Sequence, residues 1–159
     1  MDMSNRHIRH TLGAIAVGAA ALAACDSIDC TLYNTVSFAC SFYSEGQAVK
    51  LTDTLTVSAL GTDSILVNSM IGASKLELPL SYSQDADTLV LRIYGEEYDL
   101  SDTLWVEKTN TPHFESPDCP TTMFHQIKSV RHTSTFIDSV TITRNLVDYD
   151  QTENIRIHL

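Results

Sequence analysis

The stretch Thr35-Val36-Ser37-Phe38-Ala39-Cys40-Ser41-Phe42-Tyr43 decides the fold class. Its apolar side chains recur at every second position, at Val36, Phe38, Cys40 and Phe42. Successive side chains of a β-strand point to opposite faces, so this spacing predicts a strand with one buried side. We therefore expect Cys40 to be a buried free thiol that packs as a small apolar residue.

Short alternating runs of the same kind continue to the end of the chain. β-branched residues dominate them, and Gly, Asn, Asp, Ser or Pro falls between them, which is typical of strands joined by turns. The predicted strands are 32–43, 54–60, 64–68, 75–80, 88–94, 103–108, 123–132, 139–143 and 154–159. Strands at this spacing predict one all-β domain over 32–159, an antiparallel β-sandwich that is immunoglobulin-like in the broad sense. A small closed β-barrel is the alternative.

Residues 1–24 have the pattern of a secretory signal. Arg6 and Arg9 precede an uncharged stretch, rich in Ala and Gly, that runs from Leu12 to Ala24. This stretch is shorter than the about 20 apolar residues that a membrane-spanning helix needs. The pattern therefore predicts a cleaved leader.

The end of this leader, Leu22-Ala23-Ala24-Cys25, resembles the lipobox of bacterial lipoproteins. The resemblance implies cleavage before Cys25, attachment of a diacylglycerol to its thiol, and acylation of its new amine, for example by palmitate. Residues 25–31 are then a lipidated N-terminus with a short tether, and several acyl chains hold such a domain stably on a membrane. The implied location is the outer membrane, on its periplasmic face or at the cell surface. A secreted protein whose cysteine falls there by chance is the alternative.

The charge excludes one class of function. The chain has 10 basic and 20 acidic residues, for a formal net charge of −10. A surface this acidic has little to neutralise phosphate groups, so we expect no nucleic-acid partner.

Export would place the remaining cysteines in an oxidising compartment. Cys30 and Cys119 lie in loop-like sequence, and Cys40 lies in a predicted strand. We predict a Cys30–Cys119 disulfide, with Cys40–Cys119 as the alternative, because sequence alone does not fix the pairing.

A triplet of Asp, then Ser or Thr, then an aliphatic residue recurs along the chain. Asp forms local side-chain turns, so the triplets are expected to open strands. The triplet also resembles the acceptor motif of the general O-glycosylation system of exported Bacteroidota proteins. On that resemblance the candidate acceptors are Ser27, Thr54, Ser64, Thr88, Thr103 and Ser139.

The longest irregular stretch, 109–120, is a candidate for recognition, because binding residues concentrate on loops. The residues in and near it that could bind a metal are His113, Glu115, Asp118, His125 and His132. The separation of His125 and His132 places them on opposite faces of a regular strand. Metal-binding motifs are absent from the sequence, and no metal is assigned.

The acidic stretches read as solvated turns. Residues 148–153 lack the glycine and final glutamate of a calcium loop. Glu96 and Glu97, with Asp99 and Asp102 nearby, have no context that marks a pair of catalytic carboxylates. Nucleophile motifs are also missing, so no catalytic residue and no cofactor is expected.

One aromatic surface is a candidate for ligand binding. Trp105 alternates with Leu104 and Val106, which predicts an outward side chain, and Tyr94 on the preceding strand could lie beside it. Such a pair could stack a sugar ring, although aromatic pairs across strands also pack without any ligand. His113 in the irregular stretch joins this candidate surface.

The mature chain resembles a family of small uncharacterised Bacteroidota lipoproteins of about this length. The resemblance is carried by Cys25, Cys30, 111–114, Cys119, 137–140 and 153–157, whereas Cys40 departs from it. It implies a location and an architecture but no activity. We expect a non-catalytic lipoprotein that docks on an outer-membrane β-barrel protein. A glycan-binding surface lipoprotein is the alternative.

Overall fold

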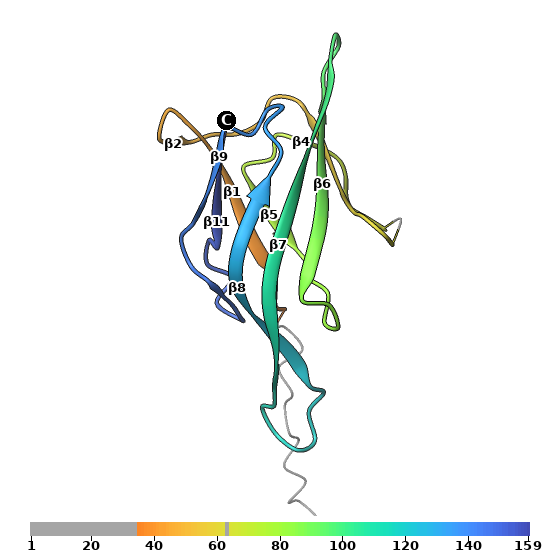
Figure 1. Ribbon diagram of the computed structural model, residues 1–159, viewed down its shortest axis with the longest axis vertical. Helices are drawn as coiled ribbons and strands as arrows, with labels where there is room; N and C mark the ends of the chain where they lie inside the picture. Colours follow the sequence, from red (N-terminus) through yellow and green to blue (C-terminus); the bar gives the residue numbers. More distant parts are fainter. Residues whose placement is uncertain (1–34, 63) are drawn as a thin grey trace, which may run out of the picture. The chain divides into compact units, whose positions relative to one another are not determined.

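The structure, a computed structural model, describes residues 35–62 and 64–159. The predicted leader and tether, with Cys25, Ser27 and Cys30, lie outside the described residues. The described part of the chain consists of strands and their connections, arranged in two sheets (Figure 1).

The first sheet is centred on β1 (Phe38–Ser44), which overlaps the stretch quoted above. On one side β1 pairs in parallel with β11 (Ile155–His158), which in turn pairs with β9 (Ser139–Ile142). On the other side β1 pairs with β5 (Lys75–Leu78) and with the short β2 (Gln47–Ala48). The last residue also joins this sheet, because the Leu159 amide donates to the Tyr43 carbonyl at 2.8 Å.

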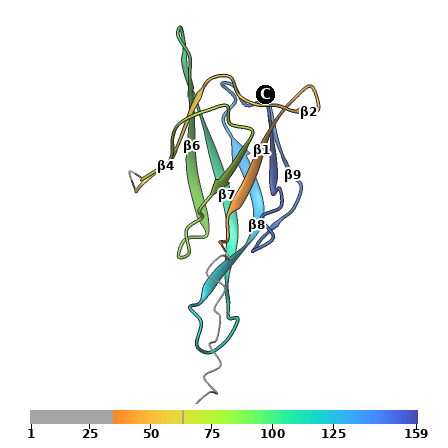
Figure 2. The ribbon, with the colours of Figure 1, turned by 180° about the vertical axis from the view of Figure 1, so that it is seen from behind.

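The second sheet is antiparallel throughout and has the order β10-β8-β7-β6-β3-β4. Its strands are β3 (Thr54–Ala59), β4 (Ser64–Ile71), β6 (Ala86–Tyr94), β7 (Asp99–His113), β8 (Thr122–His132) and β10 (Leu146–Val147). In both views the β7–β8 hairpin extends past the other strands at the end opposite the C-terminus (Figures 1 and 2).

One apolar core joins the two sheets. Phe38, Cys40 and Phe42 of β1 are fully buried, together with Leu55 of β3 and Leu104 of β7. Burial of such side chains stabilises the fold at roughly 25 cal/mol per Å² of apolar surface. The predicted sandwich is therefore confirmed, with the correction that the β1–β11 pair is parallel.

The nine predicted strands are all present, but several boundaries differ and two short strands were not predicted. The irregular stretch expected from Thr109 onward is wrong up to His113, because 109–113 pair with 122–126 and lengthen β7. The two-residue strands β2 and β10 are too short to leave an alternation pattern in the sequence.

A bulge in β8 overturns the predicted placement of two histidines. Glu107 pairs with Ser129, but Lys108 pairs with Ile127, so Lys128 is an extra residue in β8. The extra residue reverses the alternation. As a result His125 and His132 lie on the same face of the sheet, the core face, rather than on opposite faces.

Candidate functional site

The most unusual surface of the described chain is the outer edge of the second sheet. β4 is the last strand there, and Ser64-Ile65-Leu66-Val67-Asn68-Ser69-Met70-Ile71 contains no charged residue. Ile65 is 61% exposed and Ile71 75% exposed, while Leu60, just before the strand, is 67% exposed. Edge strands normally carry charges or Pro that prevent further pairing. An uncharged, aliphatic edge in so acidic a chain therefore marks a candidate interaction surface, which we call the β4 edge (Ser64–Ile71).

A local irregularity fixes the second half of this edge. The register between β3 and β4 shifts on both sides of Val57, and Ser69 has a positive φ of 52°. The Ser69 amide donates to Thr56 Oγ1 at 3.2 Å, and its hydroxyl lies 2.8 Å from the Tyr94 hydroxyl. These contacts hold the bulged backbone against β3 and β6, and Ile71 then pairs with Thr54 of β3.

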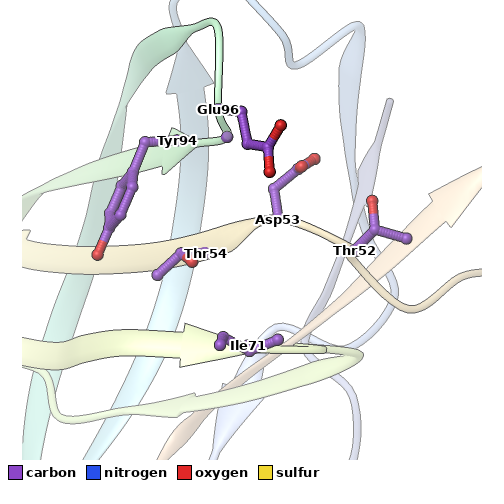
Figure 3. A pocket seen from close by; sticks show the side chains of 7 residues that line it. Thr52, Asp53, Thr54, Ile71, Tyr94 and Glu96 are labelled. Atoms are coloured by element: carbon purple, nitrogen blue, oxygen red, sulfur yellow. The ribbon is translucent and has the colours of Figure 1, made fainter.

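A small acidic pocket adjoins Ile71 (Figure 3). Its volume is about 340 Å³, and it is lined by Thr52, Asp53, Thr54, Ile71, Tyr94, Gly95 and Glu96. Figure 3 shows Asp53 and Glu96 on the same side of this pocket. Neither carboxylate makes an ion pair with a described residue.

Asp53 has an uncharged partner in Tyr98. A hydrogen bond to Asp53 raises the pKa of the Tyr98 phenol, which shows that the phenol is its donor. The nearby Arg92 is already paired with Asp99, and that contact raises the pKa of the Arg92 guanidinium. Lys50 packs over Gly72, so close that a Cβ there would lie 2.3 Å from Lys50 Cε, and makes no ion pair with a described residue.

The predicted aromatic pair does not form. Trp105 pairs with Thr88, whereas Tyr94 pairs with Asp99 at the other end of the β6–β7 ladder. At about 3.4 Å per residue, the two rings lie roughly 20 Å apart along the strands. Trp105 does lie on the outward face, as predicted, where the Arg131 guanidinium carbon lies 5.7 Å from its ring centroid.

His113 belongs to a different aromatic cluster. Its ring stacks on Phe124 with centroids 4.3 Å apart, and Tyr149 packs edge-on against both rings. Phe114, the next residue, is 65% exposed at the start of the remaining loop. His113 therefore packs at the base of this loop, away from Trp105 and Tyr94.

The buried charged group of Lys108 holds a polar cluster inside the fold. Lys108 Nζ donates to the Ser81 carbonyl at 2.8 Å and lies 3.1 Å from Asp87 Oδ2. The neighbouring His125 ring contacts Asn110 Oδ1 at 2.8 Å. Burial, with a smaller contribution from the Lys108 charge, lowers the pKa of His125 to about 4. The sequence pattern does not predict this cluster, because Lys is almost never a fully buried residue.

Among the residues that the structure describes, no three His, Cys, Asp or Glu side chains lie close enough to bind a metal. The acidic stretch 148–153 is organised by a cation instead. Arg144 donates to Asp148 at 2.7 and 2.8 Å and to Asp150 at 3.1 Å, and its hydrogen bonds lower the pKa of Asp148.

The structure tests the prediction for Cys40 but not the predicted Cys30–Cys119 bridge. Cys40 is buried and free, as predicted, so the alternative Cys40–Cys119 bridge is wrong. Cys119 is bonded in a disulfide. Its predicted partner Cys30 lies outside the described residues, so the Cys30–Cys119 pairing stays a prediction.

The candidate glycosylation acceptors differ in their surroundings. Ser64 and Ser139 are exposed and begin β4 and β9, and the half-buried Thr54 begins β3. Thr88 and Thr103 are half-buried; the triplet of Thr88 lies at the start of β6, whereas the triplet of Thr103 lies inside β7, so the expectation that it opens a strand is wrong. Asp102, in the last of these triplets, is a buried core residue.

These features define an all-β sandwich protein with an uncharged edge strand beside an acidic pocket. The chain belongs to the DUF6452 family, a family of unknown function, which matches residues 54–159. That range begins at β3 and runs to the end of the chain. Neither the comparison with curated proteins nor the comparison with solved structures returned a match. None of the described segments forms a helix of the length and apolarity that a membrane crossing requires.

Proposed function

We propose that this protein is a lipid-anchored lipoprotein of the bacterial outer membrane that acts as a non-catalytic docking module for an outer-membrane β-barrel protein. The leader and Cys25 support the anchor, through their resemblance to the lipobox. The observation that carries the docking role is the β4 edge, since exposed uncharged edges of this kind accept partner strands.

The arrangement of the described chain supports a short attachment. Thr35, the first described residue, lines one cleft of about 450 Å³ together with Thr121 and Thr122, close in sequence to Cys119. The start of the sandwich and the end of the loop between β7 and β8 therefore lie together. A Cys30–Cys119 bridge at this end would leave only a few residues between the bridge and the lipid. At about 3.4 Å per residue, five residues reach about 17 Å, so the domain would stay close to the membrane.

The anchor is tested by metabolic labelling of cells with a palmitate analogue. The natural chain should incorporate the label and sediment with the outer membrane, whereas Cys25→Ser should do neither. A Cys25→Ser chain that is still labelled would remove the lipid anchor from the proposal.

The docking role is tested by crosslinking intact cells and purifying the lipidated chain under denaturing conditions. An outer-membrane β-barrel protein should be recovered at a yield far above that of a non-crosslinked control. Recovery of no envelope protein above background counts against docking.

The glycan-binding alternative now depends on Trp105 alone, because Tyr94 lies at the far end of the same ladder. Unchanged binding to a glycan array after Trp105→Ala would remove it. O-glycosylation stays a proposal in its own right, and Ser64 and Ser139 are the most accessible of the described acceptors. Mass spectrometry of the exported protein tests their occupancy.

A further inference from the structure

The β4 edge and the acidic pocket form one continuous surface with two chemistries. Ile71 ends the uncharged strand and also lines the pocket that contains Asp53 and Glu96. The strand offers backbone groups and aliphatic side chains, and the pocket offers carboxylates without a cationic partner among the described residues. A ligand that covers both must be apolar along most of its length and basic at one end.

We propose that the β4 edge binds an extended, uncharged segment of the partner protein, and that a Lys or Arg at one end of that segment enters the pocket beside Asp53 and Glu96. This inference rests on the docking role proposed above and adds the surface and the chemistry of the partner. An eight-residue strand spans about 27 Å, enough for several aliphatic side chains of the partner to contact Ile65 and Ile71.

The bulge at Ser69 limits how such a segment pairs. Backbone pairing requires regular stretches, and the β4 edge offers only short ones, because its register with β3 shifts at Leu66 as well as next to Ser69. The affinity must therefore come in part from side chains, which is why the exposure of Ile65 and Ile71 and the charge of the pocket matter to the inference.

Charge favours a different protein over a second copy of this chain. Each copy carries a formal net charge of −10, so two copies repel one another. In an antiparallel pair of β4 strands, the acidic pocket of one copy would face the start of β4 in the other. The sequence there, Leu60-Gly61-Thr62-Asp63-Ser64, offers no cation.

The test places a photo-crosslinking amino acid at single positions of the full-length chain in intact cells. Ile65 and Ile71 report on the β4 edge, while the exposed Phe114 and Tyr82 report on the hairpin loop and on the β5–β6 connection. Mass spectrometry then identifies the residues attached to each position. We expect adducts from 65 and 71 to one uncharged, aliphatic segment of an envelope protein that is flanked by Lys or Arg.

Other outcomes overturn the inference in distinguishable ways. Adducts from 65 and 71 to this chain itself would show a second copy, and adducts to an acidic segment would contradict the pocket. Adducts from 114 or 82 alone would move docking elsewhere and leave the proposed function standing. If no position yields an adduct, the inference and the docking role both fail.

A separate experiment with a matched control tests the charge of the pocket. The double variant Asp53→Asn, Glu96→Gln should reduce the adduct yield from position 71 by about two- to fivefold, the effect of losing an exposed ion pair. Glu45→Gln removes one carboxylate from the exposed β1–β2 turn of the other sheet and should leave the yield unchanged. Equal yields from all variants would overturn the role of the pocket.

Discussion

Asp102 and Lys108 point to the same side of β7, and each binds the backbone of a connection between the two sheets. Asp102 accepts hydrogen bonds from the amides of Thr135, Phe136 and Ile137 at 2.7–2.9 Å, in the connection from β8 to β9. Lys108 donates to the carbonyls of Ser81 and Gln84, in the connection from β5 to β6. β7 thus fixes the β5–β6 and β8–β9 connections through two charged side chains, because each connection has backbone donors or acceptors that need a partner.

Replacing Asp102 should destabilise the fold more than replacing any exposed Asp or Glu. In Asp102→Asn the side chain offers only one acceptor to several amides and loses its charge, so the free energy of unfolding should fall by about 2–4 kcal/mol. Urea unfolding followed by circular dichroism measures this change. Asp99→Asn, which removes an exposed partner of Arg92, is the matched control and should change the free energy of unfolding far less, because exposed ion pairs contribute little. A variant at Asp102 as stable as the natural chain would show that the amides find other partners.

The Asp102 carboxylate should also make the free energy of unfolding depend on pH in the acid range. Burial is the largest single influence on its pKa and opposes ionisation, but the hydrogen bonds from Thr133 and the 135–137 amides outweigh it and lower the pKa to about 2. The unfolded chain binds this proton already near pH 3.8, so the stabilisation is present above that pH and is lost as the pH falls toward 2. The loss amounts to about 2 kcal/mol. Unfolding curves between pH 5 and pH 2 should show it, and in Asp102→Asn this contribution should be absent.

His125 should make the free energy of unfolding depend on pH over a different range. Its pKa is lowered to about 4 because burial and the Lys108 charge disfavour the imidazolium, although the Asp87 carboxylate acts in the opposite direction. Below pH 6.5 the unfolded chain binds a proton that the folded chain does not, so the free energy of unfolding should fall by about 3 kcal/mol between pH 7 and pH 4. Imidazole chemical shifts measured by NMR give the pKa directly. A His125 resonance that titrates near pH 6.5 in the folded protein would contradict the buried cluster.

The sequence predicted the sandwich because its apolar alternation is local, and it missed features that depend on neighbours. Val36 to Phe42 alternate in the printed sequence, and so β1 was predictable. Asp102 and Lys108 interrupt the apolar face of β7, so their burial became visible only with the loops that they bind. The composition of 64–71 does not indicate that β4 is an edge strand. The alternation of β8 likewise does not indicate that Lys128 is an extra residue. Tyr94 and Trp105 were misplaced relative to each other because the register of a hairpin depends on its turn.

The cysteines should respond to reagents in opposite ways. Burial raises the pKa of the Cys40 thiol, so Cys40 should resist alkylation in the folded protein and react only after denaturation.

Peptide mapping without reduction should link Cys119 to Cys30. Breaking this bridge with Cys119→Ser should lower the free energy of unfolding by about 4–5 kcal/mol, because the bridge would close a long loop. Cys40→Ala separates the two roles, since it creates a small cavity but leaves the linked peptides unchanged. Linkage of Cys119 to Cys25 instead would remove both the predicted bridge and the thiol that the lipid requires.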